Sequence, residues 1–304
     1  MSHLLHFVVL VVCCVAAVRP LARARWAHRM PRTGLALWQA IGLTLELSLA
    51  GLLFSAVFAP ANQGLAPGLA RLLAAPARLT DDPVGTAAAA LGVLFVGARL
   101  LALALTFTTT LRERRRHRSL LDLVARRDPE LPGVALLDHP AAAAYCLPGR
   151  HGTIVISTGA LHRLDRHHLQ AVLAHERAHL RQRHDLVLLP LLAWRRIVPR
   201  STVLDEASAS VRLLLEMLAD DTCCRTRPRR ELADALARFC AGTDQLQGPA
   251  GAFGAADIAL AERTARLLTP EPQGPPRAGR LTVLGLALVL VATPVSLFLL
   301  PVTS

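Results

Sequence analysis

Apolar residues are concentrated in four stretches of the chain, each long enough or nearly long enough to cross a bilayer at about 20 residues per helix. The first stretch is the shortest, and its end at Val15-Ala16-Ala17 is similar to that of a secretory signal peptide. A signal peptide carries positive charge before its apolar run, whereas here Arg19 follows the run. We therefore expect a retained anchor and four transmembrane helices, at Leu4 to Val18, Leu35 to Ala59, Val84 to Phe107 and Leu281 to Leu300.

Between the third and fourth apolar stretches the pattern is that of a folded body with its own core. Short runs rich in β-branched residues predict strands, and apolar residues at helical spacing predict helices. Asp165 is the expected N-cap of the first long helix after the strands. The expected elements are a helix at Ser119 to Arg127, strands at Leu131 to Leu137 and Gly152 to Thr158, a helix from the Asp165 cap through Leu180, helices at 206–226 and 231–240, and loops at 242–254 and 270–276. The apolar run Leu186 to Trp194 contains Pro190 and is too short to span, so we expect it at the membrane surface.

This pattern divides the chain into three parts. Residues 1–111 are expected to form an N-terminal membrane region with three transmembrane helices (about 4–18, 35–59 and 84–107). Residues 112–280 form the body, and residues 281–304 hold the C-terminal transmembrane helix. The fold class we predict is mainly α, a polytopic membrane protein with about four transmembrane helices and a body that contains a small β-sheet.

Charge adds an orientation to this picture. The chain has 34 Lys and Arg against 22 Asp and Glu, a net charge of +12, and every one of these basic residues is arginine. Cytoplasmic flanks of membrane spans are enriched in such residues. They cluster after the first span and after the third, so we predict the cell membrane as location, an outside N-terminus and a cytoplasmic body. These arginines are Arg19, Arg23, Arg25, Arg29 and Arg32, then Arg112, Arg114, Arg115, Arg116 and Arg118.

The positive charge also raises the possibility of nucleic-acid binding, which the rest of the composition disfavours. The chain has one tyrosine and 4% aromatic residues, and the two arginine clusters flank membrane spans. Contact with anionic lipid headgroups accounts for these clusters, so the lipid bilayer is the expected partner and no direct nucleic-acid binding is expected. Two charged residues lie inside the predicted spans. Glu46 either forms a proton or ligand site or makes a hydrogen bond that packs two helices together. Arg99 either extends its charged group toward the membrane surface or pairs with Glu46.

The candidate chemistry lies in the sequence His175-Glu176-Arg177-Ala178-His179 on a predicted helix. Residues at i and i+4 share one helix face, so two imidazoles can converge on one metal ion while the glutamate projects beside it. Zinc accepts this nitrogen pair and needs a third protein ligand. Glu176 would then act as general base on the attacking water. We predict one Zn²⁺ per chain, although imidazole and carboxylate ligands also suit other first-row metals.

The third ligand is sought among the acidic residues of a later helix. Glu216 and Asp220 are spaced i and i+4 in an otherwise apolar stretch, and buried carboxylates are costly unless they coordinate or pair. Glu216 as ligand and Asp220 hydrogen-bonded to a ligand imidazole would satisfy both. Asp221 competes for the outer role and Glu206 for the ligand role.

Another histidine close to the motif needs a separate interpretation. His184 follows His179 by five residues, but a third-histidine site of the metzincin kind requires a glycine where Gln182 stands and a different histidine spacing. We therefore expect His184 and Asp185 to serve structure at the helix end, and His162, His167 and His168 to lie on the surface.

With these motifs in place, the chain resembles the membrane metallopeptidases related to the beta-lactam-sensor antirepressors of the BlaR/MecR type, which are gluzincins. It is more distantly similar to the HtpX-like and CAAX-processing proteases. The resemblance covers nearly the whole chain and is most specific from Ala144 to Asp220, while Glu262-Arg263 to Leu267-Leu268 resembles a later Arg-x-x-x-Leu stretch more weakly. It implies a zincin-like metalloprotease body. It also implies His175, His179 and Glu216 as zinc ligands, Glu176 as catalytic base and Asp220 as supporting carboxylate.

The departures from that family limit the expected function. The penicillin-sensing domain of the sensors would follow the last span, where Pro301 to Ser304 remain, so we expect no direct beta-lactam sensing by this chain. The resemblance implies regulatory proteolysis of a protein substrate such as a transcriptional repressor. An HtpX-like quality-control protease and a non-catalytic receptor or scaffold are the alternatives.

The sequence also suggests how a substrate would bind. We expect a peptide to add as an extra strand beside the strand at Gly152 to Thr158. Candidates for stabilising the oxyanion are Tyr145, His151 and Arg212.

Overall fold

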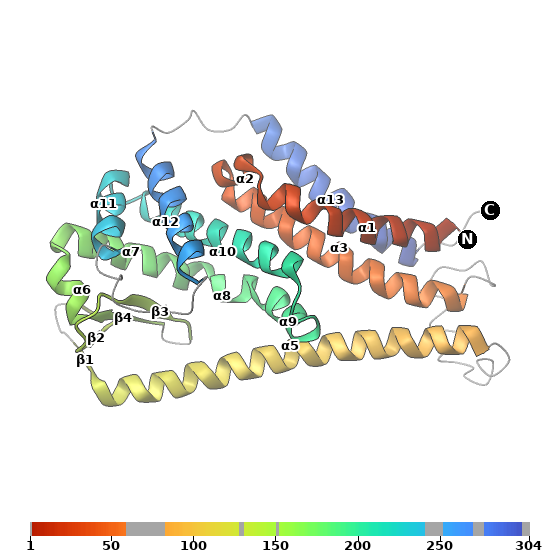
Figure 1. Ribbon diagram of the computed structural model, residues 1–304, viewed down its shortest axis with the longest axis horizontal. Coiled ribbons are helices and arrows are strands. Elements are labelled where there is room, and N and C mark those ends of the chain that lie inside the picture. The colour runs from red at the N-terminus through yellow and green to blue at the C-terminus, as the bar shows by residue number, and fades with distance from the viewer. Residues whose placement is uncertain are drawn as a thin grey trace. The chain divides into compact units, whose positions relative to one another are not determined.

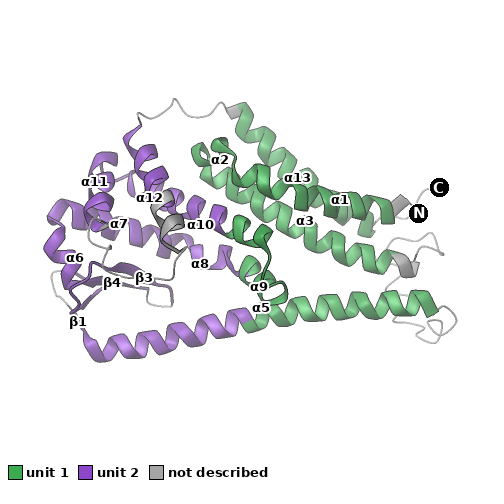
Figure 2. Ribbon diagram, viewed as in Figure 1, with its two compact units in different colours: residues 1–105, 190–208, 275–304 green, residues 106–189, 209–274 purple. Residues whose placement is uncertain are grey.

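The computed structural model describes residues 2–58, 83–127, 131–149, 152–240, 252–269 and 277–299. The described part is mainly helical with one small mixed sheet, and this confirms the predicted fold class. The chain separates into two compact units (Figure 2). Unit 1 comprises residues 1–105, 190–208 and 275–304, and unit 2 comprises residues 106–189 and 209–274. Residues 59–82, His151 and the loop expected at 270–276 lie outside the described residues.

Four helices are long and apolar enough to cross a membrane, and these are the helices of a multi-pass membrane protein. They are α1 (Ser2–Ala22), α3 (Pro31–Phe58), α5 (Pro83–Val124) and α13 (Arg277–Leu299). Each coincides with one of the predicted spans, except that Ala59 and Leu300, the last residues of two of these spans, lie outside the described residues. Many of their large apolar side chains are exposed, as expected of helices whose surroundings are lipid.

Within unit 1, α3 packs along both α1 and α13 (Figure 1). Phe7 of α1 is fully buried against Leu52 and Phe54 of α3, and its ring meets that of Phe298 edge to face. A Cβ at Gly51 would overlap the Phe7 ring, so this glycine allows α1 and α3 to approach closely. Small residues commonly serve this purpose between membrane helices. The short helices α2 (Arg25–Arg29) and α9 (Leu189–Ile197) complete the described elements that lie largely in this unit.

Unit 2 contains a four-stranded sheet in the order β1-β2-β4-β3 (Figure 1). Strand β4 is parallel to β2 and antiparallel to β3, and β1 is antiparallel to β2. The strand expected at Gly152 to Thr158 is therefore an inner strand, so a peptide cannot add beside it and that prediction is wrong. Among the described residues β1 and β3 form the two edges of the sheet. The strands are β1 (Ala125–Arg127), β2 (Val134–Leu137), β3 (Ala144–Leu147) and β4 (Thr153–Ser157).

The two faces of this sheet have different partners because side chains alternate along each strand. Ile154 and Ile156 pack with Leu173 of the long helix α7 (Arg166–Gln182). On the opposite face, Val155 packs with Leu121 near the end of α5. The expected helix at Ser119 to Arg127 ends early, at Val124, because residues 125–127 pair with residues 135–137 as strand β1.

Later helices share a second core with α7. Asp165 caps α7 by accepting hydrogen bonds from the backbone N–H groups of His167 and His168, as predicted. A second core cluster joins α7 to residues of three later helices, through Val172, Cys223, Leu232 and Leu267. The helix at Ala252–Leu268 begins inside the loop expected at 242–254. The helices are α6 (Thr158–Arg163), α8 (His184–Val187), α10 (Thr202–Cys223), α11 (Arg229–Cys240) and α12 (Ala252–Leu268).

Candidate metal centre

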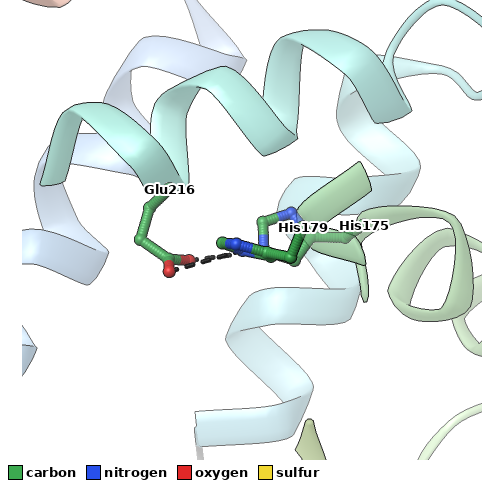
Figure 3. A group of neighbouring side chains, drawn as sticks. All are labelled: His175, His179 and Glu216. Carbon is green, nitrogen blue, oxygen red and sulfur yellow. Dashed lines mark hydrogen bonds and ion pairs between the residues drawn. The ribbon is translucent and has the colours of Figure 1, made fainter. Parts of the chain in front are cut away.

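Two helices of unit 2 bring three potential metal ligands together. His175 and His179 lie one turn apart on α7, and Glu216 faces them from α10 (Figure 3). Residues i and i+4 lie on the same face of a helix, which is why the two imidazoles converge. The α10 helix presents Glu216 and Asp220 with the same spacing, so its acidic face is opposed to the histidine face.

The distances between the three side chains fit zinc. His179 Nε2 lies 3.1 Å from His175 Nε2, and Glu216 carboxylate oxygens lie 3.3 Å from His175 Nε2 and 3.4 Å from His179 Nε2. Ligand atoms on a tetrahedral ion with bonds of about 2.0–2.1 Å are separated by about 3.3–3.4 Å. Two imidazoles and one carboxylate are also a common protein ligand set of catalytic zinc. The donor set and its spacing therefore suit a zinc ion.

Asp220 lies behind His175. Its Oδ1 is 3.0 Å from His175 Nδ1, the ring nitrogen that faces away from Glu216, and its side chain is only 1% exposed. A carboxylate in this position favours the tautomer that carries hydrogen on Nδ1 and leaves Nε2 free to bind a metal. The two competitors named from the sequence have other partners, because Asp221 pairs with Arg266 and Glu206 pairs with Arg19.

Arg263 is a member of the site that the sequence indicated only weakly. It comes from α12 and donates two hydrogen bonds to Asp220, Nε to Oδ2 at 2.9 Å and Nη2 to Oδ1 at 2.7 Å. Its Nη1 lies 2.9 Å from Glu216 Oε2. One guanidinium thus compensates both carboxylates of α10, and this planar two-point pairing is characteristic of arginine. The available signal in the sequence was that Glu216 and Asp220, two acids in an apolar stretch, need a cation nearby.

The charges of the site shift its pKa values in opposite directions. Burial alone would lower the pKa of His175, but interactions with Asp220 and Glu216 outweigh it and raise the pKa to about 9. Burial would raise the pKa values of Glu216 and Asp220, yet their hydrogen bonds to His175 and the charge of Arg263 bring both below the usual range. The site therefore stabilises positive charge on the imidazole side and negative charge on the carboxylates, as a cation site does.

Glu176 projects from the same turn of α7 and lies beside the edge strand. Helix α7 packs against β3, and Cys146 of β3 lies next to the Glu176 carboxylate. Burial raises the pKa of the Cys146 thiol to about 12, helped by the negative charge of Glu176 and a hydrogen bond to it. This places the expected general base near β3, whose outer edge has no strand partner among the described residues.

His184 contacts the expected metal ligand His179 directly, a contact that the sequence did not indicate. Its Nδ1 lies 2.8 Å from His179 Nδ1, and the two rings are nearly perpendicular. Burial and then the neighbouring His179 lower the pKa of His184 to about 4. The expectation of a purely structural role at the helix end is therefore incomplete for His184. Asp185 has such a role, because it pairs with Arg114 at 2.8 Å.

The remaining candidates are placed elsewhere. Tyr145 is hydrogen-bonded to His117 at 2.7 Å, and Arg212 is exposed on α10. His162 and His167 are exposed as expected, but His168 is buried and its Nδ1 lies 2.7 Å from Asp165. The structure thus brings together His175, His179, Glu216 and Asp220, with Glu176 on the same helix.

Four apolar helices and a His-His-Glu cluster on two further helices describe a multi-pass membrane protein with a candidate metal site. Residues 110–212 match the model of Peptidase family M48, a family of zinc metallopeptidases. The match includes both histidines and Glu176, ends before Glu216 and covers less than half of the chain. It supports the expected relationship to zinc metallopeptidases, while the narrower BlaR/MecR type stays a prediction. No solved structure matches the chain.

Proposed function

We propose that this protein is a membrane-bound zinc metalloendopeptidase that hydrolyses peptide bonds of a cytoplasmic or membrane protein. The observation that carries the proposal is the convergence of His175, His179 and Glu216 at distances that suit one zinc ion. The M48 match over the residues that contain the histidine motif supports the same activity.

The residues around the cluster suit peptide hydrolysis. When bound, zinc supplies Lewis-acid polarisation of the scissile carbonyl and activation of the attacking water. Glu176 accepts the proton of that water and passes it to the leaving amine, as general base and then acid. Asp220 keeps the Nε2 lone pair of His175 directed at the metal. Arg263 holds the carboxylates of Asp220 and Glu216 in place.

The outer edge of β3 provides a place for an extended substrate. A peptide that adds as a strand beside Ala144–Leu147 satisfies its backbone hydrogen bonds there. Such a peptide also passes close to Glu176, because the Glu176 carboxylate lies next to Cys146 of the same strand. Hydrogen bonds to the main chain make such binding tolerant of side-chain sequence, so specificity comes from access to the site and from side-chain pockets.

For the substrate we propose a regulatory protein such as a transcriptional repressor, on the basis of the resemblance described above. The arginine clusters favour a cytoplasmic location of unit 2 and contact with anionic lipid, which would bring a cytoplasmic regulator within reach. Cleavage of many damaged membrane proteins, as in quality control, is the alternative.

The first experiment measures zinc content in the purified detergent-solubilised protein, beside His175→Ala and Glu216→Ala. We expect about one zinc per chain, lost in both variants. Exposed residues on the same two helices provide matched controls, His167→Ala on α7 and Asp205→Ala on α10, and both should retain zinc. Absence of metal from the gently purified protein would overturn the proposal in favour of a receptor or scaffold.

The second experiment tests catalysis with Glu176→Gln. This variant should keep zinc but lose about 10²–10⁴-fold in peptidase activity, the usual contribution of a positioned general base. In cells, accumulation of one regulator in the variant would support regulatory proteolysis. Accumulation of many membrane proteins would select quality control, and unchanged protein levels would contradict both.

A further inference from the structure

The His179 ring contacts His184 through its Nδ1 atom, on the side of the ring that faces away from the proposed metal position. His184 Nδ1 is 2.8 Å from His179 Nδ1, whereas His179 Nε2 faces His175 and Glu216. His184 is buried, with 5% of its surface exposed, although it follows the last residue of α7 by only two positions. Its position is therefore set by packing and hydrogen bonds.

A chain of hydrogen bonds determines which nitrogen carries hydrogen. The hydroxyl of Thr222 donates its single hydrogen to the backbone carbonyl of Leu218 at 2.9 Å, so it must accept the hydrogen bond from the Gln182 amide nitrogen. The amide oxygen of Gln182 then faces His184 Nε2 at 2.7 Å and accepts a hydrogen from it. Neutral His184 with hydrogen on Nε2 has an acceptor at Nδ1.

The last step of the chain reaches the metal ligand. Since His184 Nδ1 is an acceptor, His179 Nδ1 donates to it, and His179 carries its hydrogen on Nδ1. Its Nε2 lone pair is then free and directed at the cluster. We infer that His184 is a positioning residue that holds His179 in the tautomer and orientation needed to bind zinc, with Gln182 and Thr222 fixing its own hydrogen. This inference rests on the proposed zinc site.

The backbone near His184 supports this role. Arg183 ends α7 in the left-handed conformation, with φ of 50°, and among the described non-glycine residues it alone has positive φ. This conformation is unfavourable for a side chain other than glycine, so the surrounding contacts must maintain it. It turns the chain sharply, and the Asp185–Arg114 pair at 2.8 Å anchors the residue that follows His184.

A role of His184 as a further metal ligand disagrees with the geometry. Its close nitrogen faces His179 Nδ1, while the ligand atoms converge at His179 Nε2 on the other side of the ring. Among the described residues, the group whose atoms converge contains only His175, His179 and Glu216. His184 therefore acts through His179, much as Asp220 acts through His175.

The test compares two substitutions of His184 by zinc affinity, measured by competition with a chromophoric chelator on the full-length protein in detergent. His184→Leu removes the acceptor, and we expect zinc affinity to fall 10–100-fold, the usual effect of losing such a partner. His184→Asn keeps a hydrogen-bonding group close to the position of Nδ1, and we expect affinity within about fivefold of wild type. The cobalt-substituted absorption spectrum should change in the leucine variant and be restored in the asparagine variant.

Further variants keep the test decisive if His184→Leu folds poorly. Thr222→Val removes the hydroxyl at the end of the chain with little change in shape and should weaken zinc binding several-fold, since Gln182 is then no longer oriented. His168→Leu removes another buried imidazole, at the far end of α7, and should leave zinc affinity unchanged.

Two results have different consequences. Zinc affinities within twofold of wild type in both His184→Leu and Thr222→Val would overturn the inference about His184 and leave the zinc site intact. Absence of zinc binding by the wild-type protein would overturn the proposed function, and the inference with it.

Discussion

Arg263 and Asp220 form a two-point ion pair in which the carboxylate is only 1% exposed. The pair joins α12 to α10, and Asp220 in turn contacts His175, so the arginine also supports this expected metal ligand through the aspartate. A buried charge that loses its partner is strongly destabilising, which makes this pair a sensitive point of unit 2.

Replacement of Arg263 by methionine should lower the free energy of unfolding of the metal-free protein by about 3–5 kcal/mol. The loss should be smaller in the zinc-loaded protein, because the metal adds positive charge next to the same carboxylates. Thermal or denaturant unfolding of both forms measures the difference. Arg266→Met is the matched control, since its partner Asp221 is a third exposed and the pair is worth little. Equal losses in the two variants would contradict this account.

The raised pKa of His175 predicts how zinc binding depends on pH. In the metal-free protein this imidazole is protonated below its pKa of about 9, whereas a metal ligand must be deprotonated. Zinc must therefore displace a proton at neutral pH. Apparent affinity should rise about tenfold per pH unit between pH 6 and pH 8 and level off above about pH 9. Titration calorimetry in buffers of different ionisation enthalpy should show at least one proton released at pH 7.

The raised pKa of His175 also makes the stability of the metal-free protein depend on pH. Because the pKa is raised on folding, protonation of His175 stabilises the metal-free fold at low pH, and this contribution is lost as the pH rises through about 9. Asp220→Asn removes the first of the interactions that raise the pKa, so the levelling-off of zinc affinity should move to lower pH. A zinc affinity that does not change between pH 6 and pH 8 would refute the prediction.

The parts of the site that the sequence predicted are those fixed by local geometry. His175 and His179 lie on one face because a helix repeats every 3.6 residues, and the same holds for Glu216 and Asp220. The capping role of Asp165 is local for the same reason. Once the helices are predicted, these relationships follow without knowledge of the tertiary fold.

The parts that the sequence did not predict depend on contacts between distant segments. Arg263 is 43 residues from Asp220, and its helix begins in a stretch rich in glycine and alanine. The edge position of β3 depends on which strands pair, and periodicity carries no information about that. Arg183 in the left-handed conformation turns His184 toward His179, and a non-glycine residue gives little warning of such a turn. Tertiary contacts decided these features.

The predicted orientation can be tested with reporters fused at three positions. Fusions after residue 30 and after residue 130 should report the cytoplasm, and a fusion after residue 70 should report the outside. Each juxtamembrane arginine is worth about 1 kcal/mol near an anionic cytoplasmic surface, so the clusters after the first and third spans should set this topology. Residues 70 and 130 lie outside the described residues. A cytoplasmic signal at residue 70 would refute the orientation, and with it the cytoplasmic site.

Within unit 1, Arg99 and Glu46 form an ion pair between two of the candidate spans, α5 and α3. Arg99 is 5% exposed and donates through Nε to Glu46 Oε1 at 3.1 Å. Trp194 of α9 donates to the same carboxylate oxygen at 3.0 Å, and its ring lies 4.6 Å from the Arg99 guanidinium. Arg99 also donates to the carbonyl of Pro190 at 3.1 Å. Arg99 therefore pairs with Glu46, which was one of the two alternatives expected from the sequence. Through Trp194 and Pro190 the two residues also hold α9 against the spans.

Arg99→Met should reduce stability in detergent by about 3–5 kcal/mol, because it leaves the Glu46 carboxylate in apolar surroundings with Trp194 as its remaining partner among those described. The double variant Arg99→Met/Glu46→Gln should lose less than the single variant, since no unpaired charge remains. Arg19→Met is the control, because its pair with Glu206 is largely exposed and should contribute about 1 kcal/mol or less. The free energy of unfolding of each variant, measured by denaturant titration in detergent, separates these cases. A double variant that is less stable than Arg99→Met would mean that packing, and not charge compensation, dominates at this position.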